Sequence, residues 1–235
     1  MISKRMALVG DALSHVALPG LALGILFGFY PFIGAFAFLA TSAIVTWQLQ
    51  KSTELPVESI IGVIFVLALA VGILITPQID LLEALFGDVS SVTVADVLMT
   101  VLVSVLVVVV LRAIYDKVAL GMISRELAVS NRINVDRINL IYLLLVSTIV
   151  ALGIKEVGTL LVGAVVIVPA AAARNISSGL RRFSLLSGIF GIISAVVGVV
   201  ASGLFALPAG PLVVLAGAAL FATGLALRRS IPVRG

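Results

Sequence analysis

Residues 101–111 read VLVSVLVVVVL, an apolar run that contains one serine and no charged side chain. Runs this rich in valine also form buried strands in water-soluble proteins. This run, however, lies within a longer apolar stretch, 97–115, and shows no alternation of polar and apolar residues. Its length and its lack of alternation favour a helix in lipid, where a helix satisfies its own backbone hydrogen bonds.

The composition of the whole chain agrees with a membrane protein. Of 235 residues, 62% are hydrophobic and 11% are charged, whereas soluble domains are about 45–50% apolar and about 25% charged. Such a chain has too little polar surface to cover a water-soluble globule. A soluble enzyme, a disordered chain and a nucleic-acid-binding module are therefore excluded. The absence of cysteine excludes disulfides and thiolate metal sites.

Eight stretches are candidates for membrane spans. They predict an all-α fold, a polytopic membrane bundle of about eight helices that forms a single domain over residues 1–235. Between the fifth and sixth stretches only Lys155 and Glu156 mark a break. The eight stretches are 6–27, 31–49, 57–76, 97–115, 138–154, 157–173, 183–206 and 211–227.

The basic residues predict the topology. If both termini are cytoplasmic and eight spans alternate, 14 of the 15 Lys and Arg residues lie inside and Lys155 lies outside. This asymmetry is the positive-inside pattern of multi-pass proteins. We therefore interpret the net charge of +4 as topology in the cytoplasmic membrane, with lipid and not nucleic acid around the chain. The inside residues are Lys4, Arg5, Lys51, Arg112, Lys117, Arg125, Arg132, Arg137, Arg174, Arg181, Arg182, Arg228, Arg229 and Arg234.

One predicted outside segment, 77–96, carries only acidic charges. It holds Asp80, Glu83, Asp88 and Asp96 and has no Lys or Arg. The segment is either a solvated loop with a short helix, or a docking surface whose potential attracts cations.

Asp11 and His15 are the main ionisable pair within a predicted span. Four residues apart, they share one face of a helix. A carboxylate oxygen with an imidazole nitrogen suits Zn²⁺ or Mn²⁺ better than Cu⁺, and Pro19 with Gly20 would break or kink the helix just afterwards. The alternative is an Asp–His hydrogen bond that merely stabilises the helix, since two ligands do not close a metal site.

Glu58 is the next candidate ligand, at the start of the third predicted span. It could instead favour the helix N-terminus electrostatically or extend to the interface. A role in an ion path would require Glu58 to face the same cavity as His15. The chain has no G-x-x-x-x-G-K-[ST] motif and no H-E-x-x-H motif. We therefore expect a transporter and no enzyme, driven by a partner or by an ion gradient.

The segment 112–137 mixes charges of both signs with apolar residues. This pattern fits a short amphipathic helix on the membrane surface, or one that enters a groove of a cytosolic partner. Composition does not choose between these two possibilities.

Several motifs, in this order, resemble the permease subunit of metal-ion ABC importers, the ABC-3 group that takes up zinc, manganese or iron. The resemblance covers essentially the whole chain, and its first motif together with the Pro-Ala-Ala-Ala-Ala-Arg motif is the specific part. The motifs are Arg5-Met6 with Gly10-Asp11-Ala12-Leu13-Ser14-His15 and Leu18-Pro19-Gly20, Glu58 with Ile61-Gly62, Leu85-Phe86-Gly87, Glu126-Leu127-Ala128, Val157-Gly158-Thr159-Leu160-Leu161, Val168-Pro169-Ala170-Ala171-Ala172-Ala173-Arg174, and Leu207-Pro208-Ala209-Gly210-Pro211.

The resemblance implies a homodimer with an ion path between the two copies. Two cytosolic ATPase subunits would dock beneath it, and an extracytoplasmic metal-binding protein would deliver the ion. Asp11 and His15 match the acid and the histidine of the motif that lines the path. The segment 124–136 matches the coupling helix, which assigns Arg125, Glu126, Leu127, Ala128 and Arg132 to the ATPase contact. No cofactor is implied for this chain, and the sequence does not choose among Zn²⁺, Mn²⁺ and Fe²⁺ as the transported ion.

Two features depart from the family pattern. Members usually have one further hydrophobic span before Arg5-Met6, where this chain has Met1-Ile2-Ser3-Lys4, so we expect a bundle without the family's first helix. Arg132 stands where the family commonly has glycine, which would end the coupling helix with a positive φ. With arginine there, we expect the helix to end instead at Asn131 or Asn134.

The expected function is therefore the membrane-spanning subunit of an ATP-driven importer of a divalent transition metal. One alternative is a gradient-driven carrier or channel, which would need more carboxylates within the membrane than this chain has. Another is a truncated, inert membrane subunit.

Overall fold

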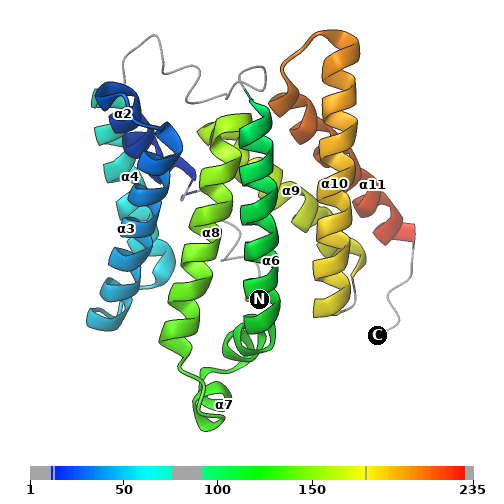
Figure 1. Cartoon of the computed structure of the whole chain (residues 1–235). Coiled ribbons are helices and arrows are strands. Elements are labelled where there is room, and N and C mark those ends of the chain that lie inside the picture. Colours follow the sequence, from blue (N-terminus) through cyan, green and yellow to red (C-terminus); the bar gives the residue numbers. More distant parts are fainter. Residues whose placement is uncertain (1–11, 13, 76–91, 178, 231–235) are drawn as a thin grey trace.

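The computed structural model describes residues 12, 14–75, 92–177 and 179–230. Over these residues the chain is helical, without strands, as the composition predicts. Figure 1 shows the helices standing side by side in one bundle. They are α2 (Leu18–Phe27), α3 (Pro31–Ser52), α4 (Val57–Ile75), α6 (Val94–Ile123), α7 (Arg125–Ser130), α8 (Val135–Val157), α9 (Thr159–Ile176), α10 (Leu180–Phe205) and α11 (Ala209–Ser230).

Most of these helices are long enough to cross a membrane. Within the described residues, 6 helices have the length and hydropathy of a span. Two shorter apolar helices accompany them, Ser14–Phe27 and Leu161–Ile176. The prediction of an all-helical membrane bundle is confirmed, while the number of eight crossings stays a prediction.

Two predicted boundaries differ from the structure. We expected the fourth span to end at residue 115, but α6 continues to Ile123. Residues 112–123 are therefore no surface helix but the end of a 30-residue helix, about 45 Å long. The break after the fifth span lies at Gly158 and not at Lys155 and Glu156, because Gly158 adopts a φ of 79° that other residues rarely tolerate.

The helix α8 connects two groups of three helices. The helices α2, α3 and α4 pack on one another, and so do α9, α10 and α11. Between these groups, α8 packs against α3, α6 and α9 (Figure 1). The helix α8 is therefore in contact with both groups.

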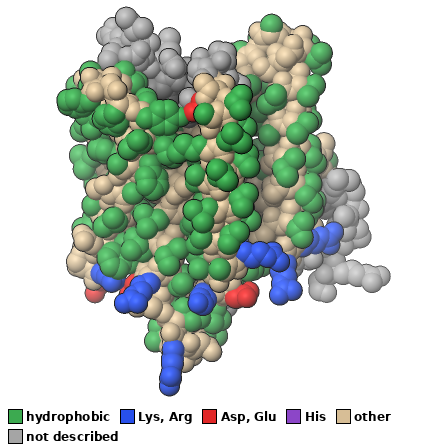
Figure 2. All heavy atoms as spheres, in the orientation of Figure 1, with side chains coloured by type: hydrophobic (Ala, Val, Ile, Leu, Met, Phe, Trp, Pro, Cys, Tyr) green, Lys and Arg blue, Asp and Glu red, His purple; other side chains and the backbone are tan. Residues whose placement is uncertain are grey.

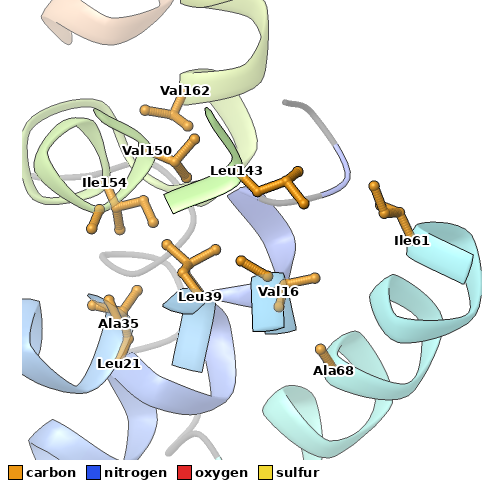
Figure 3. Packing of buried hydrophobic residues seen from close by; sticks show 13 residues of the cluster. Val16, Leu21, Ala35, Leu39, Ile61, Ala68, Leu143, Val150, Ile154 and Val162 are labelled. Carbon is orange, nitrogen blue, oxygen red and sulfur yellow. The ribbon is translucent and has the colours of Figure 1, made fainter. Parts of the chain in front are cut away.

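The main buried cluster lies where the first group meets α8 and α9. Figure 3 shows Val16 beside Leu39 of α3, with Leu143 of α8 and Ile61 of α4 around them. Each of these four side chains is almost fully buried. Burial of a side chain this size contributes about 1.5–3 kcal/mol in water, and in lipid the same close packing holds helices together through dispersion forces.

The exterior is apolar along the helices and basic at one end. The helix α6 exposes a row of large side chains that includes Leu102 and Leu106. Figure 2 shows hydrophobic side chains over the flanks of the molecule, and Lys and Arg side chains gathered at the end where α7 lies. An apolar surface of this extent suits lipid rather than water.

Candidate functional site

His15 lies in a helical segment that continues through Pro19. The apolar helix begins at Ser14 and runs to Phe27, where Gly28 ends it with a φ of 67°. We expected Pro19 and Gly20 to break or kink this helix. A turn at Ala17 separates the helical residues 14–16 from α2. Pro19 then occupies the first turn of α2, a position at which proline costs no hydrogen bond.

The imidazole ring of His15 packs against α4. Its centroid lies 5.3 Å from the centroid of the Phe65 ring, and the two rings are tilted by 58°. His15 itself is half-buried, while its neighbours Ser14 and Val16 are fully buried. The position of His15 is therefore set by its ring contact with Phe65 and by the burial of the residues directly before and after it.

Glu58 belongs to α4, the helix that His15 contacts, but it lies nearer the start of that helix than Phe65 does. It occupies the first turn of α4 and is half-buried, where a negative charge is favoured by the helix dipole. Seven residues separate Glu58 from Phe65, which is about 10 Å along the axis. His15 thus contacts α4 at Phe65, about two helical turns from Glu58 in the same helix.

The third candidate ligand, Asp11, lies outside the described residues, so its pairing with His15 stays a prediction. Across the ranges that the structure describes, no three His, Cys, Asp or Glu side chains come close enough to hold a metal ion together. His15 and Glu58 are therefore the two described candidate ligands, and they form no closed site.

Close backbone contacts fix the helix that carries His15. A Cβ added to Gly20 of α2 would lie 2.2 Å from the carbonyl oxygen of Gly34 in α3. On the other side, a Cβ added to Gly72 of α4 would lie 2.8 Å from Leu18. Small residues at such positions let helices approach closely in lipid.

At the end opposite α7, Asp96 joins two helices. The Thr93 side chain accepts a hydrogen bond from the Asp96 N–H, and the Asp96 carboxylate accepts one from the Thr93 N–H, which is a capping box at the start of α6. The Tyr30 hydroxyl, just before α3, donates to the same carboxylate. The other acids of this segment, Asp80, Glu83 and Asp88, lie outside the described residues, and the docking hypothesis stays open.

The short helix α7 projects from the basic end (Figure 1). Ser124 caps it by accepting the Leu127 N–H at 3.2 Å. Glu126 and Leu127 are exposed, whereas Ala128 is 0% exposed and anchors the helix. Of the residues assigned to a partner, the structure thus presents Glu126 and Leu127 outward and says nothing of the Arg125 side chain.

Arg132 ends this segment in an unexpected way. Its φ is 58°, in the left-handed region. The Ile133 N–H bonds to the Ala128 carbonyl at 3.0 Å, and the Arg132 N–H to that of Val129 at 2.9 Å, a pattern typical of a helix that ends with glycine. The helix has its C-cap at Asn131, one of the two ends that we expected. What we did not expect is that Arg132, directly after it, adopts the conformation of the family's glycine.

Sequence reasoning missed the contacts between the end of α3 and the start of α8. The Trp47 indole N–H donates to the Asp136 carbonyl at 2.8 Å, and Asn139 donates to Gln50 at 2.8 Å. Trp47 is the single tryptophan of the chain, which could have drawn attention to it. No spacing pattern in the sequence connects it with a residue 89 positions later.

Comparison with known proteins identifies the family. The model of the ABC 3 transport family matches residues 1–228. The chain belongs to this family. A manganese transport system membrane protein, MntC, from Listeria innocua is 30% identical over 195 residues, which is 81% of this chain and 70% of that protein. The high-affinity zinc uptake system membrane protein ZnuB from Haemophilus influenzae is 30% identical over 182 residues, 75% of this chain and 70% of that protein.

A solved structure has the same architecture. A chain of PsaBC from Streptococcus pneumoniae in complex with Fab superposes with a TM-score of 0.77. It is 29% identical in sequence, and the match covers 93% of this chain and 80% of that one. The present chain is thus a multi-pass membrane permease subunit of an ABC transporter.

Proposed function

We propose that this permease carries Mn²⁺ or Zn²⁺ across the cytoplasmic membrane into the cell. The observation that carries the proposal is the family match over residues 1–228, together with relatives named for manganese and zinc transport. The half-buried imidazole of His15, in a helix of the bundle, supports it, because imidazole is a common ligand of both ions.

The energy for import would come from a separate ATPase. The chain has no P-loop motif of its own, and its most projecting element, α7, lies at the basic end that the positive-inside pattern assigns to the cytoplasm. In this proposal two copies of the chain form the path between them. An ATPase pair binds α7 beneath, and an extracytoplasmic metal-binding protein delivers the ion at the opposite end, near Asp96.

His15, with Asp11 and Glu58, would provide ligands along the path. The transported ion is cargo and must leave again, so an incomplete ligand set on one copy fits transport better than a closed structural site would. Facing copies of the chain in a dimer would supply further ligands. No cofactor bound to this chain is part of the proposal.

We predict that His15→Ala abolishes metal uptake while the protein still inserts into the membrane. Phe65 and the buried neighbours of His15 would still pack, so the loss should be specific to the ion. Uptake of radioactive Mn²⁺ by cells that depend on this permease measures it, with membrane abundance as the control. Wild-type uptake in the variant would contradict the role of His15.

A co-purification experiment tests the partner. A P-loop ATPase should purify with the wild-type chain, and the double charge reversal Arg125→Glu with Glu126→Arg should abolish the association. A chain that purifies alone and carries Mn²⁺ into liposomes without ATP would instead support the gradient-driven alternative.

A further inference from the structure

Polar contacts join the last turns of α3 to the first turns of α8. Besides the hydrogen bonds from Trp47 to the Asp136 carbonyl and from Asn139 to Gln50, the Lys51 ammonium lies 3.8 Å from the centroid of the Trp47 ring. This distance is typical of a cation–π interaction. We call these five residues the α3–α8 clasp.

The α8 half of the clasp, Asp136 and Asn139, follows α7 closely along the chain. Four residues, 131–134, connect α7 with α8. The Ile133 N–H bonds back to the Ala128 carbonyl, and the Asn134 side chain caps α8 by accepting the Arg137 N–H at 3.1 Å. Because this turn is closed by hydrogen bonds and Ala128 is buried, a displacement of α7 passes to the start of α8.

Beyond the clasp, α3 packs against the helical segment that contains His15. Higher in the bundle, the Ser147 hydroxyl of α8 donates to the Leu39 carbonyl of α3 at 3.4 Å. Leu39 lies beside Val16 in the buried cluster (Figure 3). The backbones of α3 and α2 then meet at Gly34 and Gly20. Packed contacts therefore run without a gap from α7 to the segment of His15.

We infer that the α3–α8 clasp makes α7, α8 and α3 one rigid lever, which transmits movement of the ATPase to the metal path. Trp47 and Asn139 act in it as positioning residues, since neither belongs to the proposed ion ligands or to the residues assigned to the ATPase contact. The inference rests on the proposed function, in which α7 is the element that binds the ATPase. Coupling is a free energy between two sites and has to be measured as such.

The measurement is the number of Mn²⁺ ions taken up per ATP hydrolysed. The chain, its ATPase and the Mn²⁺-loaded binding protein are reconstituted in liposomes. Trp47→Phe keeps the aromatic ring beneath Lys51 and removes the N–H donor, and Asn139→Leu removes the donor to Gln50. We expect either substitution to lower the ratio about fivefold, at the lower end of typical coupling energies, while ATP hydrolysis continues.

Ser52→Ala is the matched control in the same helix. The Ser52 hydroxyl bonds to carbonyls of its own helix, at Gln48 and Leu49, so its loss should leave the ratio unchanged. If Trp47→Phe does not assemble, Asn139→Leu decides alone. An unchanged ratio in the assembled clasp variants would overturn the inference, as would an equal fall in the control.

A cross-link gives an independent test, since the natural chain has no cysteine. In the double variant Gln50→Cys with Asn139→Cys, a short thiol-reactive cross-linker joins the two helices. A rigid lever keeps transporting Mn²⁺ when cross-linked, because its parts move together. Uptake that stops on cross-linking and returns on cleavage of the linker would show that α3 and α8 must separate, and would overturn the inference.

These results are distinguishable from a failure of the proposed function. A wild-type chain that binds no ATPase refutes the proposed function and the inference with it. A wild-type complex that couples normally, beside clasp variants that couple equally well, refutes the inference alone.

Discussion

Arg132 carries a conformational cost at the tip of the molecule. The φ of Arg132 is 58°, in the left-handed region. This conformation costs a residue with a Cβ roughly 1 kcal/mol relative to glycine. The two backbone hydrogen bonds at this turn are satisfied only with that conformation. The turn geometry therefore outweighs the preference of the residue itself.

We predict that Arg132→Gly stabilises the protein. Removing the strain should raise the melting temperature of the purified chain by about 2–4 °C, as expected for about 1 kcal/mol in a chain of this length. Arg132→Ala is the control, because alanine loses the guanidinium but keeps the strained backbone. Equal melting temperatures for the two variants would contradict the explanation.

The residues of the candidate path were predictable in type but not in surroundings. The spacing of Asp11 and His15 and the polarity of Glu58 drew attention to them within apolar stretches. Their distance from one another depends on how α2 lies on α4. The contact between His15 and Phe65 follows from that packing and from no pattern in the sequence.

Between elements, the contact of α2 with α3 depends on two glycines. We predict that Gly20→Ala destabilises the bundle by about 1–3 kcal/mol, the usual range for overpacking, because the new Cβ would meet the Gly34 carbonyl. Gly188→Ala in α10 is the control, since a Cβ there meets no described atom within 4 Å, and alanine favours a helix. Thermal melting in detergent compares them, and equal stability of both variants would contradict the close contact.

The exposed face of α7 gives a second prediction at the scale of elements. Leu127 is 53% exposed, so Leu127→Asp should leave the fold intact. It should weaken ATPase binding about thirtyfold, the effect of losing an apolar hot spot of about 2 kcal/mol. Leu127→Met keeps the apolar volume and should bind nearly as the wild type does. A binding assay that finds the two variants equal would argue against Leu127 as a contact.

The whole molecule has one basic end and one end that bears Asp96, which predicts its orientation in the membrane. Because the natural chain lacks cysteine, single cysteines can report it. Val94→Cys, at a residue 78% exposed at the start of α6, should react with an impermeant maleimide in intact cells. Ser130→Cys in α7 should react only after the membrane is opened. Both should react fully in detergent, and the reverse pattern would refute a cytoplasmic α7.

The sequence by itself determined that the chain lies in lipid and that its fold is helical. Long apolar stretches need lipid around them and must form helices there, and the placement of the basic residues predicts the topology. These are local properties, so they can be read along the chain. The motifs were likewise contiguous, which is why the family was recognisable from them.

Only the tertiary structure decided which helices meet and at which residues. The clasp joins Trp47 to Asp136 and Gln50 to Asn139, and α8 lies between two groups of helices. All these helices present similar apolar faces, so hydrophobicity does not rank one pairing above another. The helix pairings are selected by the close packing of particular side chains, which depends on how their shapes fit in three dimensions.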